Sequence, residues 1–104
     1  MITDFFLGFI KIHILYHASK EPVFGLELIK ELARHGYHIS PGTLYPILHR
    51  LLNEQYLTSK PEVVNGKVRK YYRITSRGKK ALQECRAKIR ELVDEVIKGK
   101  IGSA

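Results

Sequence analysis

The stretch that most constrains the fold of this chain is Ser40–Glu54, which has the pattern of a helix with one apolar and one polar side. Ser40-Pro41 predicts the helix start, because proline at the first helical position gives up only an amide hydrogen that the helix does not use. At about 100° per residue, one side collects apolar residues: Leu44, Leu48, Leu51 and Leu52, with Tyr45 and Ile47 at its margins. The opposite side collects residues that include no acid: Gly42, Thr43, Pro46, His49, Arg50 and Asn53.

This polar side leaves two interpretations open. A helix held by leucines and presenting hydrogen-bonding side chains suits insertion into a DNA major groove. A surface helix with a solvated side has the same pattern. Pro46 removes the hydrogen bond to the Gly42 carbonyl. We therefore expect a loose first turn, or a regular helix that begins near Thr43.

The first helix is expected to run from Thr3 to about Ser19 and to be apolar around nearly its whole circumference. Its apolar residues are Phe5, Phe6, Leu7, Phe9, Ile10, Ile12, Ile14, Leu15 and Tyr16. A single domain of 104 residues does not easily cover such a helix on all sides. We expect the excess surface to contact a second copy of the chain, and complete burial within one chain is the alternative.

The second helix is expected to begin at Gly25 and to end at Gly36, which is typical of a helix C-terminus. Its inward residues are predicted to be Leu26, Ile29, Leu32 and Ala33. A short link then leads to the Ser40 helix. Helix, short turn and helix form the DNA-binding helix-turn-helix arrangement, in which the second helix is the reader.

Asn65-Gly66 is a strong signal for a two-residue hairpin turn, because both positions tolerate positive φ. A fold at that point pairs Leu57 with Ile74, Val63 with Val68, and Glu62 with Arg69. Pro61 places its strand at the edge of the sheet, since proline donates no backbone hydrogen bond.

The hairpin is strongly cationic. Residues 60–80 hold eight basic side chains and one acidic one, in a chain whose formal net charge is +8. The hairpin's own basic residues are Lys60, Lys67, Arg69, Lys70 and Arg73. Such a run is often only a solvated surface. Directly behind a polar-sided helix, it also has the character of a wing that contacts DNA phosphates.

A last helix is expected from a cap at Thr75 or Ser76 to about Lys98. Leu82, Cys85, Ile89, Leu92 and Val96 recur at spacings of three and four, with Val93 and Ile97 beside them. This seam is too short to hold a coiled coil alone. It becomes a dimer element if it packs with the first helix, and packing within one chain is the alternative. Residues 99–104 are expected to be a frayed tail.

The sequence gives no case for an enzyme, because it contains no phosphate-binding glycine loop, nucleophile motif or paired carboxylates. His13 and His17 are spaced to share a helix side, but no third ligand is apparent, so no metal and no cofactor are expected. The single cysteine, Cys85, excludes an internal disulfide and favours the cytoplasm. Lys11 and His13 interrupt the apolar stretch 5–16, which is too short to span a membrane.

Three segments together resemble the PadR-like family of winged-helix transcriptional regulators: FGLELIKEL, ISPGTLYPILHRLLNE and RKYYRITSRGKKAL. The resemblance covers about residues 8–85. It implies a cytoplasmic repressor that binds palindromic DNA as a homodimer through one C-terminal helix. It also implies that Thr43, Tyr45 and Pro46 lie where the reader begins to meet DNA, that Arg50 lies on its exposed turn, and that Lys67, Arg69 and Lys70 belong to the wing.

The resemblance has departures and one further implication. Leu26 stands where members commonly have an aromatic residue, and Gln55-Tyr56 replaces the usual glycine-leucine. Both positions are expected to repack without loss of DNA binding. Members often respond to phenolic or lipophilic compounds near the dimer interface. This chain has no tryptophan, so a flat effector would have to stack on Phe5, Phe6, Phe9 or Tyr16.

The predicted fold is mainly α with a small β-hairpin, in a single domain. Residues 3–75 are expected to form the winged helix-turn-helix and residues 76–98 the dimerisation helix. Predicted DNA-binding residues are Ser40, Gly42, Thr43, Tyr45, Pro46, His49, Arg50 and Asn53 in the reader, and Lys60, Asn65, Gly66, Lys67, Arg69, Lys70 and Arg73 in the wing. The predicted dimer interface holds Phe5, Phe6, Phe9, Leu82, Cys85, Ile89, Leu92, Val93 and Val96.

Two functions remain open from the sequence. The first is a dimeric repressor in which Arg50 and His49 contact base edges while Tyr45 and the wing cations position the backbone. The second is a winged helix that contacts proteins, as an anti-repressor or adaptor, without specific DNA binding. RNA binding is a weaker alternative, because an aromatic stacking platform is lacking.

Overall fold

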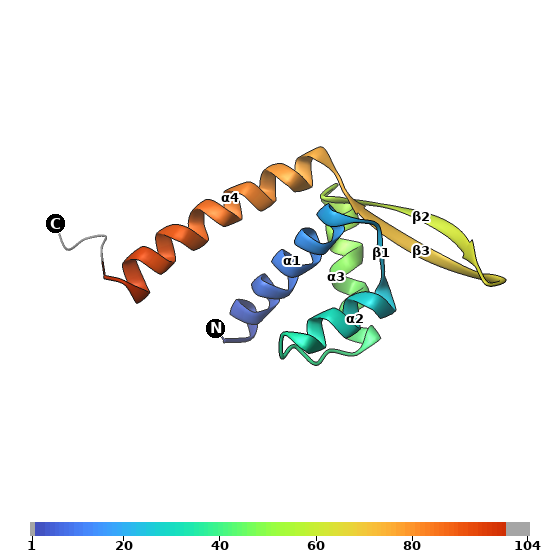
Figure 1. Ribbon diagram of the computed structural model, residues 1–104, viewed down its shortest axis with the longest axis horizontal. Coiled ribbons are helices and arrows are strands. Elements are labelled where there is room, and N and C mark those ends of the chain that lie inside the picture. The colour runs from blue at the N-terminus through green and yellow to red at the C-terminus, as the bar shows by residue number, and fades with distance from the viewer. Residues whose placement is uncertain (1, 100–104) are drawn as a thin grey trace.

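The computed structural model describes residues 2–99, which fold into helices and one small sheet (Figure 1). The elements in chain order are α1 (Ile2–Lys20), β1 (Val23–Phe24), α2 (Gly25–Arg34), α3 (Pro41–Asn53), β2 (Leu57–Val64), β3 (Lys67–Ile74), α4 (Ser76–Leu92) and a short π-helix, η1 (Val93–Ile97). The mainly α fold with a small sheet is therefore confirmed. Of the predicted frayed tail, residues 100–104 lie outside the described part of the chain.

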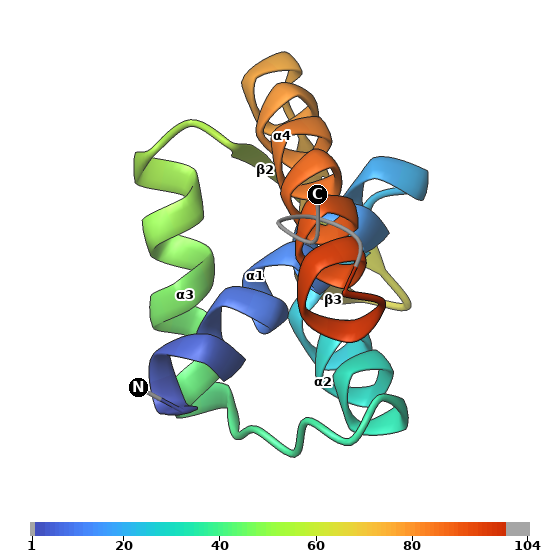
Figure 2. The same cartoon turned by 90° about the vertical axis from the view of Figure 1, so that its left-hand side faces the viewer.

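The described chain is elongated, with extents of 60 × 28 × 21 Å. Helices α1, α2 and α3 form a central body, from which the β2–β3 hairpin and α4 project in opposite directions (Figure 1). In the view turned by 90°, α4 passes in front of α1, while α2 and α3 lie to either side (Figure 2). The hairpin and the end of α4 are thus the two parts with the least support from the body.

One hydrophobic core joins all three helices of the body, the inner end of the sheet and the start of α4. Its members are Ile10, Ile14, Leu15 and Ala18 of α1, Leu28 and Leu32 of α2, Leu44, Ile47, Leu48 and Leu51 of α3, and Val23, Leu57, Tyr72 and Leu82. Ile14, Leu28, Leu32, Leu44 and Leu48 are fully buried. Burying a side chain of this size contributes about 1.5–3 kcal/mol, so these five residues fix how the helices are rotated.

Helix α3 begins one residue after Ser40, as its Ser-Pro start predicts. Ser40 is the N-cap residue and its carbonyl accepts from Thr43 and Leu44 at 3.0 Å, but its hydroxyl makes no capping hydrogen bond. The expectation of a loose first turn or a start near Thr43 is wrong, because the helix is regular from Pro41. Pro46 is tolerated since both it and Gly42 lie on the exposed side, where water can satisfy the Gly42 carbonyl.

The inward side of α2 differs from the prediction. Leu28 is fully buried, whereas Leu26, expected to face inward, is 55% exposed. Gly25 lies against the Tyr45 ring so closely that a methyl group at Gly25 would collide with it. This close contact and the burial of Leu28 and Leu32 place one side of α2 against the body and leave Leu26 on the outer side.

Two helices end in the same backbone motif with different residues. Gly36 ends α2 as predicted, with φ of 87°, while Gly36 N–H donates to Ala33 and Tyr37 N–H donates to Leu32. After α3, Gln55 N–H donates to Leu52 and Tyr56 N–H donates to Leu51. These are Schellman motifs. In the second one, a glutamine occupies the left-handed position with φ of 65°.

The hairpin has the predicted register. Leu57 pairs with Ile74, Glu62 with Arg69 and Val63 with Val68, and the turn residues Asn65 and Gly66 have φ of 51° and 75°. The sheet order is β1-β3-β2, so β2 is an edge strand, as Pro61 predicts. Strand β1 is an addition that the sequence did not reveal; it pairs Val23 with Tyr72 and Phe24 with Tyr71.

Thr75 joins α4 to the end of α3. Its hydroxyl accepts from the Gly78 amide at 3.0 Å and donates to the Gln55 carbonyl at 2.6 Å. Thr75 is therefore the N-cap that was one of the two predicted residues. The predicted continuous helix to Lys98 is regular only to Leu92 and continues as η1 to Ile97.

We expect Gln55→Gly to raise the free energy of unfolding by about 1 kcal/mol, because an L-residue in the left-handed region costs roughly 1–2 kcal/mol that glycine avoids. The Gln55 side chain is exposed, so its loss removes no packing. Urea denaturation followed by circular dichroism measures the change.

The matched control is Gln83→Gly, at an exposed position within α4. Glycine inside a helix lowers the free energy of unfolding by about 1 kcal/mol. Destabilisation by both substitutions to the same extent would contradict the role assigned to the Gln55 backbone.

Candidate nucleic-acid interface

The polar side of α3 is open to solvent along its whole length. All the predicted reader residues are exposed: Ser40, Gly42, Thr43, Tyr45, Pro46, His49, Arg50 and Asn53. The opposite side is anchored by Leu44, Ile47, Leu48 and Leu51, while Leu52 is only half-buried. The orientation predicted for this helix is therefore confirmed, with Ile47 taking the core position expected for Leu52.

The reader residues divide between two flanks of α3. Tyr45 lies on the flank toward α2 and the sheet, where it contacts Gly25. Arg50 lies on the flank toward α1, where it lines a shallow recess with Leu7, Lys11 and Pro46. Arg50 is exposed and is not enclosed by its own chain. The two flanks can thus contact different parts of one ligand.

A recess connects the reader helix with the hairpin. It has a volume of about 360 Å³ and is lined by residues of three regions: Phe24, Gly25 and Leu26 before and in α2, Tyr45 of α3, and Val68, Arg69 and Lys70 of β3. Tyr45 also lies near Tyr72; burial, and secondarily Tyr45, raises the pKa of the Tyr72 hydroxyl. Tyr72 therefore stays neutral beneath the recess. The hairpin and α3 form one continuous surface here.

The cationic residues of the hairpin have different surroundings. The Arg69 guanidinium lies over the Phe24 ring, 4.6 Å from its centroid, and Arg73 Nη2 is 3.9 Å from Glu62 Oε1. Glu62 thus pairs with Arg73, although Arg69 is its cross-strand neighbour. Lys60, Lys67 and Lys70 are exposed and form no ion pair with any other residue of the described range 2–99.

Strand alternation divides these cations between the two sides of the hairpin. Lys70 shares its side with Tyr72 and Ile74, which pack on the body, so Lys70 faces the reader side. Lys67, Arg69 and Arg73 alternate onto the other side, although Arg69 also reaches the edge of the recess, where it lies over Phe24. Lys67 adjoins the Asn65-Gly66 turn at the tip, where one side chain can reach past the edge of the hairpin. Of the hairpin's cations, Lys70 thus lies toward α3 and Lys67 lies at the tip.

A second surface is apolar and lies on α1 and α4, away from the hairpin. Exposed fractions are 52% for Phe5, 50% for Leu92 and 71% for Val96, while Phe9, Cys85, Ile89 and Val93 are half-buried. Phe6, also predicted at the dimer interface, is 46% exposed, but its ring lies beside that of Tyr37 in the link between α2 and α3, with centroids 6.0 Å apart. Leu82, predicted at the dimer interface, is instead buried in the core of its own chain and cannot contact a partner. The seam thus becomes more exposed toward its C-terminal end.

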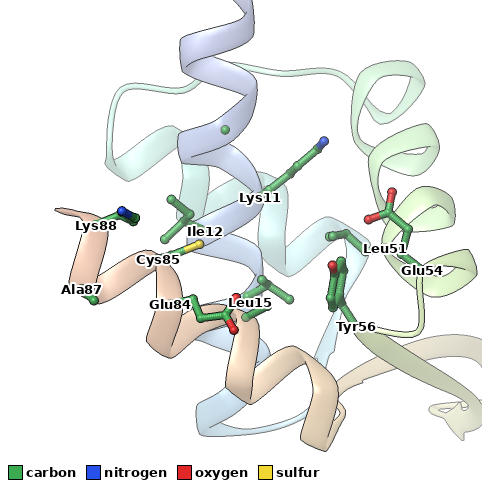
Figure 3. A pocket seen from close by; sticks show the side chains of 12 residues that line it. Lys11, Ile12, Leu15, Leu51, Glu54, Tyr56, Glu84, Cys85, Ala87 and Lys88 are labelled. Atoms are coloured by element: carbon green, nitrogen blue, oxygen red, sulfur yellow. The ribbon is translucent and has the colours of Figure 1, made fainter. Parts of the chain in front are cut away.

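A groove of about 710 Å³ separates α1 from α4, and a smaller one of about 330 Å³ adjoins it between Phe5, Phe9, Ile89 and Leu92. In the larger groove, Ile12 and Leu15 of α1 lie opposite Cys85 of α4, with Tyr56 and Leu51 at one end (Figure 3). The aromatic residue that lines this groove is Tyr56, which was not predicted from the sequence to stack on an effector, whereas Tyr16 does not line the groove.

None of the helices within residues 2–99 has the length and apolar character that a bilayer span requires.

Comparisons with known proteins agree with this geometry. Residues 14–84 match the Transcriptional regulator PadR-like family. The transcriptional regulator Rv3488 of Mycobacterium tuberculosis is 46% identical over 103 residues, which cover 99% of this chain and 96% of the relative.

Solved structures are similar over almost the whole chain. A PadR family transcriptional regulator from Eggerthella lenta is 35% identical, with a TM-score of 0.81 and coverage of 99% of this chain and 91% of that one. A PadR-like transcription factor from Bacteroides fragilis is 32% identical, with a TM-score of 0.80 and coverage of 92% and 94%. The winged-helix architecture is thus shared with these proteins.

Proposed function

The chain belongs to the PadR-like family of transcriptional regulators, and we propose that it is a cytoplasmic repressor that binds double-stranded DNA as a homodimer on an inverted repeat. Regulators of this family are not enzymes. The observation that carries this proposal is the continuous surface formed by the exposed side of α3 and the cationic hairpin. An α-helix fits the major groove of B-DNA, and lysines beside it fit the flanking phosphates.

The reader helix supports direct base contacts. His49, Arg50 and Asn53 are exposed on the side of α3 that faces away from the core. Arginine offers two parallel donors to the O6 and N7 atoms of guanine, whereas histidine and asparagine each offer a donor and an acceptor. Thr43 and Tyr45, near the start of the helix, are placed to contact the sugar-phosphate backbone at the groove edge.

The apolar surface of α1 and α4 supports a homodimer. Large apolar side chains exposed along one seam are typical of an interaction site, because a partner that covers them removes apolar surface from water. A second copy offers the same seam, and a two-fold axis would bring the two seams together. The same axis would place two reader helices about 34 Å apart, or near a multiple of this distance, as an inverted repeat requires.

A second candidate function rests on the tip of the hairpin. Val63 and Val68 face each other across β2 and β3 and are 73% and 72% exposed. An exposed apolar pair at the end of a projecting hairpin suits contact with a protein partner. This alternative predicts no dependence of duplex binding on the wing lysines.

We expect Lys70→Ala to weaken binding to any duplex and to make the plot of log affinity against log salt concentration shallower by about 0.9, the value for one phosphate contact. Arg73→Ala is the matched control, because it removes the same charge from the same strand, but from a residue paired with Glu62 on the other side. Fluorescence anisotropy with a random duplex at several salt concentrations measures both slopes. Equal slopes for wild type and Lys70→Ala would favour the protein-contact alternative.

We expect Arg50→Ala to reduce discrimination between the operator and random duplex by about 1–3 kcal/mol, the value of one bidentate base contact. Lys67→Ala is the comparison, and it should weaken both duplexes alike. Competition binding with the two duplexes separates these effects. Equal losses of specific and random binding in both variants would show that the division into base and phosphate contacts is wrong.

We expect Leu92→Lys to convert the dimer into a monomer, because it places a charge on the exposed seam of α4. Gln83→Lys adds the same charge at an exposed position of α4 outside the seam and should leave the dimer intact. Light scattering after gel filtration gives the mass in solution. A wild-type mass equal to one chain would contradict the proposal.

A further inference from the structure

Three histidines far apart in the sequence lie together at the junction of α1 and α2. We call His13, His17 and His35 the histidine cluster. His13 and His17 are one turn apart on α1, and His35 is the C-cap residue of α2. The spacing of His13 and His17 offers two ligands from one helix, and the third comes from the end of α2, which packs beside α1.

The three imidazoles are close, and His13 is nearly parallel to each of the other two rings, while His17 and His35 are tilted by 35° with centroids 6.2 Å apart. The centroids of His13 and His35 are 4.6 Å apart with planes at 22°, and those of His13 and His17 are 6.4 Å apart with planes at 16°. One ring nitrogen from each histidine can be chosen so that all three lie within 4.8 Å of one another. Within residues 2–99, none of these rings makes a hydrogen bond.

We propose that the histidine cluster is a binding site for a divalent transition-metal ion such as Zn²⁺. Neutral imidazole nitrogens are preferred ligands for zinc, cobalt, nickel and copper ions. Ligand nitrogens about 2.0–2.1 Å from a tetrahedral ion lie about 3.4 Å apart. Because the chosen nitrogens lie within 4.8 Å of one another, the cluster has to close by at most about 1.4 Å. Rotation of the histidine side chains, above all that of the exposed His35, can supply this closure.

The surroundings of His13 favour the neutral ring that an ion needs. Burial lowers the pKa of His13, and the neighbouring His35 and His17 lower it further. Three imidazoles at this distance cannot all carry a charge without repulsion, whereas one bound ion satisfies all three lone pairs. Metal binding requires the deprotonated rings.

Two carboxylates of α2, those of Glu27 and Glu31, lie beside His17. Glu31 Oε2 lies 3.8 Å from His17 Nε2, and Glu31 is held in place by Arg34 at 2.8 Å. Glu27 and Glu31 line a recess of about 110 Å³ with His17, and Glu27 Oε1 is buried without a hydrogen-bond partner among the described residues. Such acids orient a ligating histidine through its second nitrogen and offset the charge of the ion.

The test is titration of the metal-free wild-type chain with Zn²⁺ by calorimetry and with Co²⁺ by visible absorption. We expect one ion per chain, ligand-field bands for bound Co²⁺, and a higher thermal midpoint with Zn²⁺, because an ion that binds only the folded state stabilises it. His35→Gln should lower Zn²⁺ affinity at least 10-fold and remove the cobalt bands, since even loss of an outer partner costs about 10–100-fold.

The matched control is His38→Gln, an exposed histidine in the same loop and outside the cluster, which should bind both ions as the wild type does. Because His35 is exposed, its variant should keep the metal-free thermal midpoint, which separates loss of a ligand from loss of the fold. Equal Zn²⁺ affinity in the wild type and His35→Gln, or no binding by the wild type, would overturn the proposal. These titrations involve no DNA, so their outcome is independent of the proposed function.

Discussion

The rest of the structure depends on the burial of the leucine side of α3. Leu44 and Leu48 have no measurable exposure, and Leu51 is 3% exposed. Rotation of the helix would move these side chains into water at a cost of about 1.5–3 kcal/mol each. The core thus fixes which residues α3 presents, so that Arg50 and Asn53 are exposed without needing contacts of their own. A helix of this kind is positioned by its apolar packing, and the polar residues on its other side determine what it can contact.

The hairpin is positioned by a different set of contacts. Its inner end is held by Leu57 and Tyr72 in the core and by the pairing of β1 with β3. Its outer end projects from the body, and its cations extend the polar surface of α3 through the shared recess. The stacking of Arg69 on Phe24 ties the cationic side to the start of α2. The projecting α4 leaves its apolar seam exposed at the other end of the molecule.

The sequence predicted what depends on local physics. The Asn65-Gly66 turn fixed every pair of the hairpin register, and Thr75, Gly36 and Ser40 were each placed correctly at helix ends. Predictions from the sequence were wrong where contacts between residues far apart in the chain determine which side chains are buried. Leu26 and Leu28 both fit a helical apolar pattern, and only the packing of α2 against the rest of the core shows that Leu28 is the buried one. Strand β1 has only two residues, which is too short for the alternation of apolar and polar residues that predicts a strand.

The same limit explains the histidines and Leu82. His35 joins His13 only because α2 folds back on α1, which no sequence spacing reveals. Leu82 shares its seam with Ile89 and Leu92, yet α4 meets the core only at its start.

The central claim is that two α3 helices read one DNA site as a symmetric pair. Selection of bound sequences from a random duplex pool by the wild-type chain tests it most directly. The account predicts an inverted repeat whose half-sites are centred about 10 base pairs apart, or near a multiple of one helical turn. Enrichment of a single unpaired motif, or of no motif at all, would contradict it.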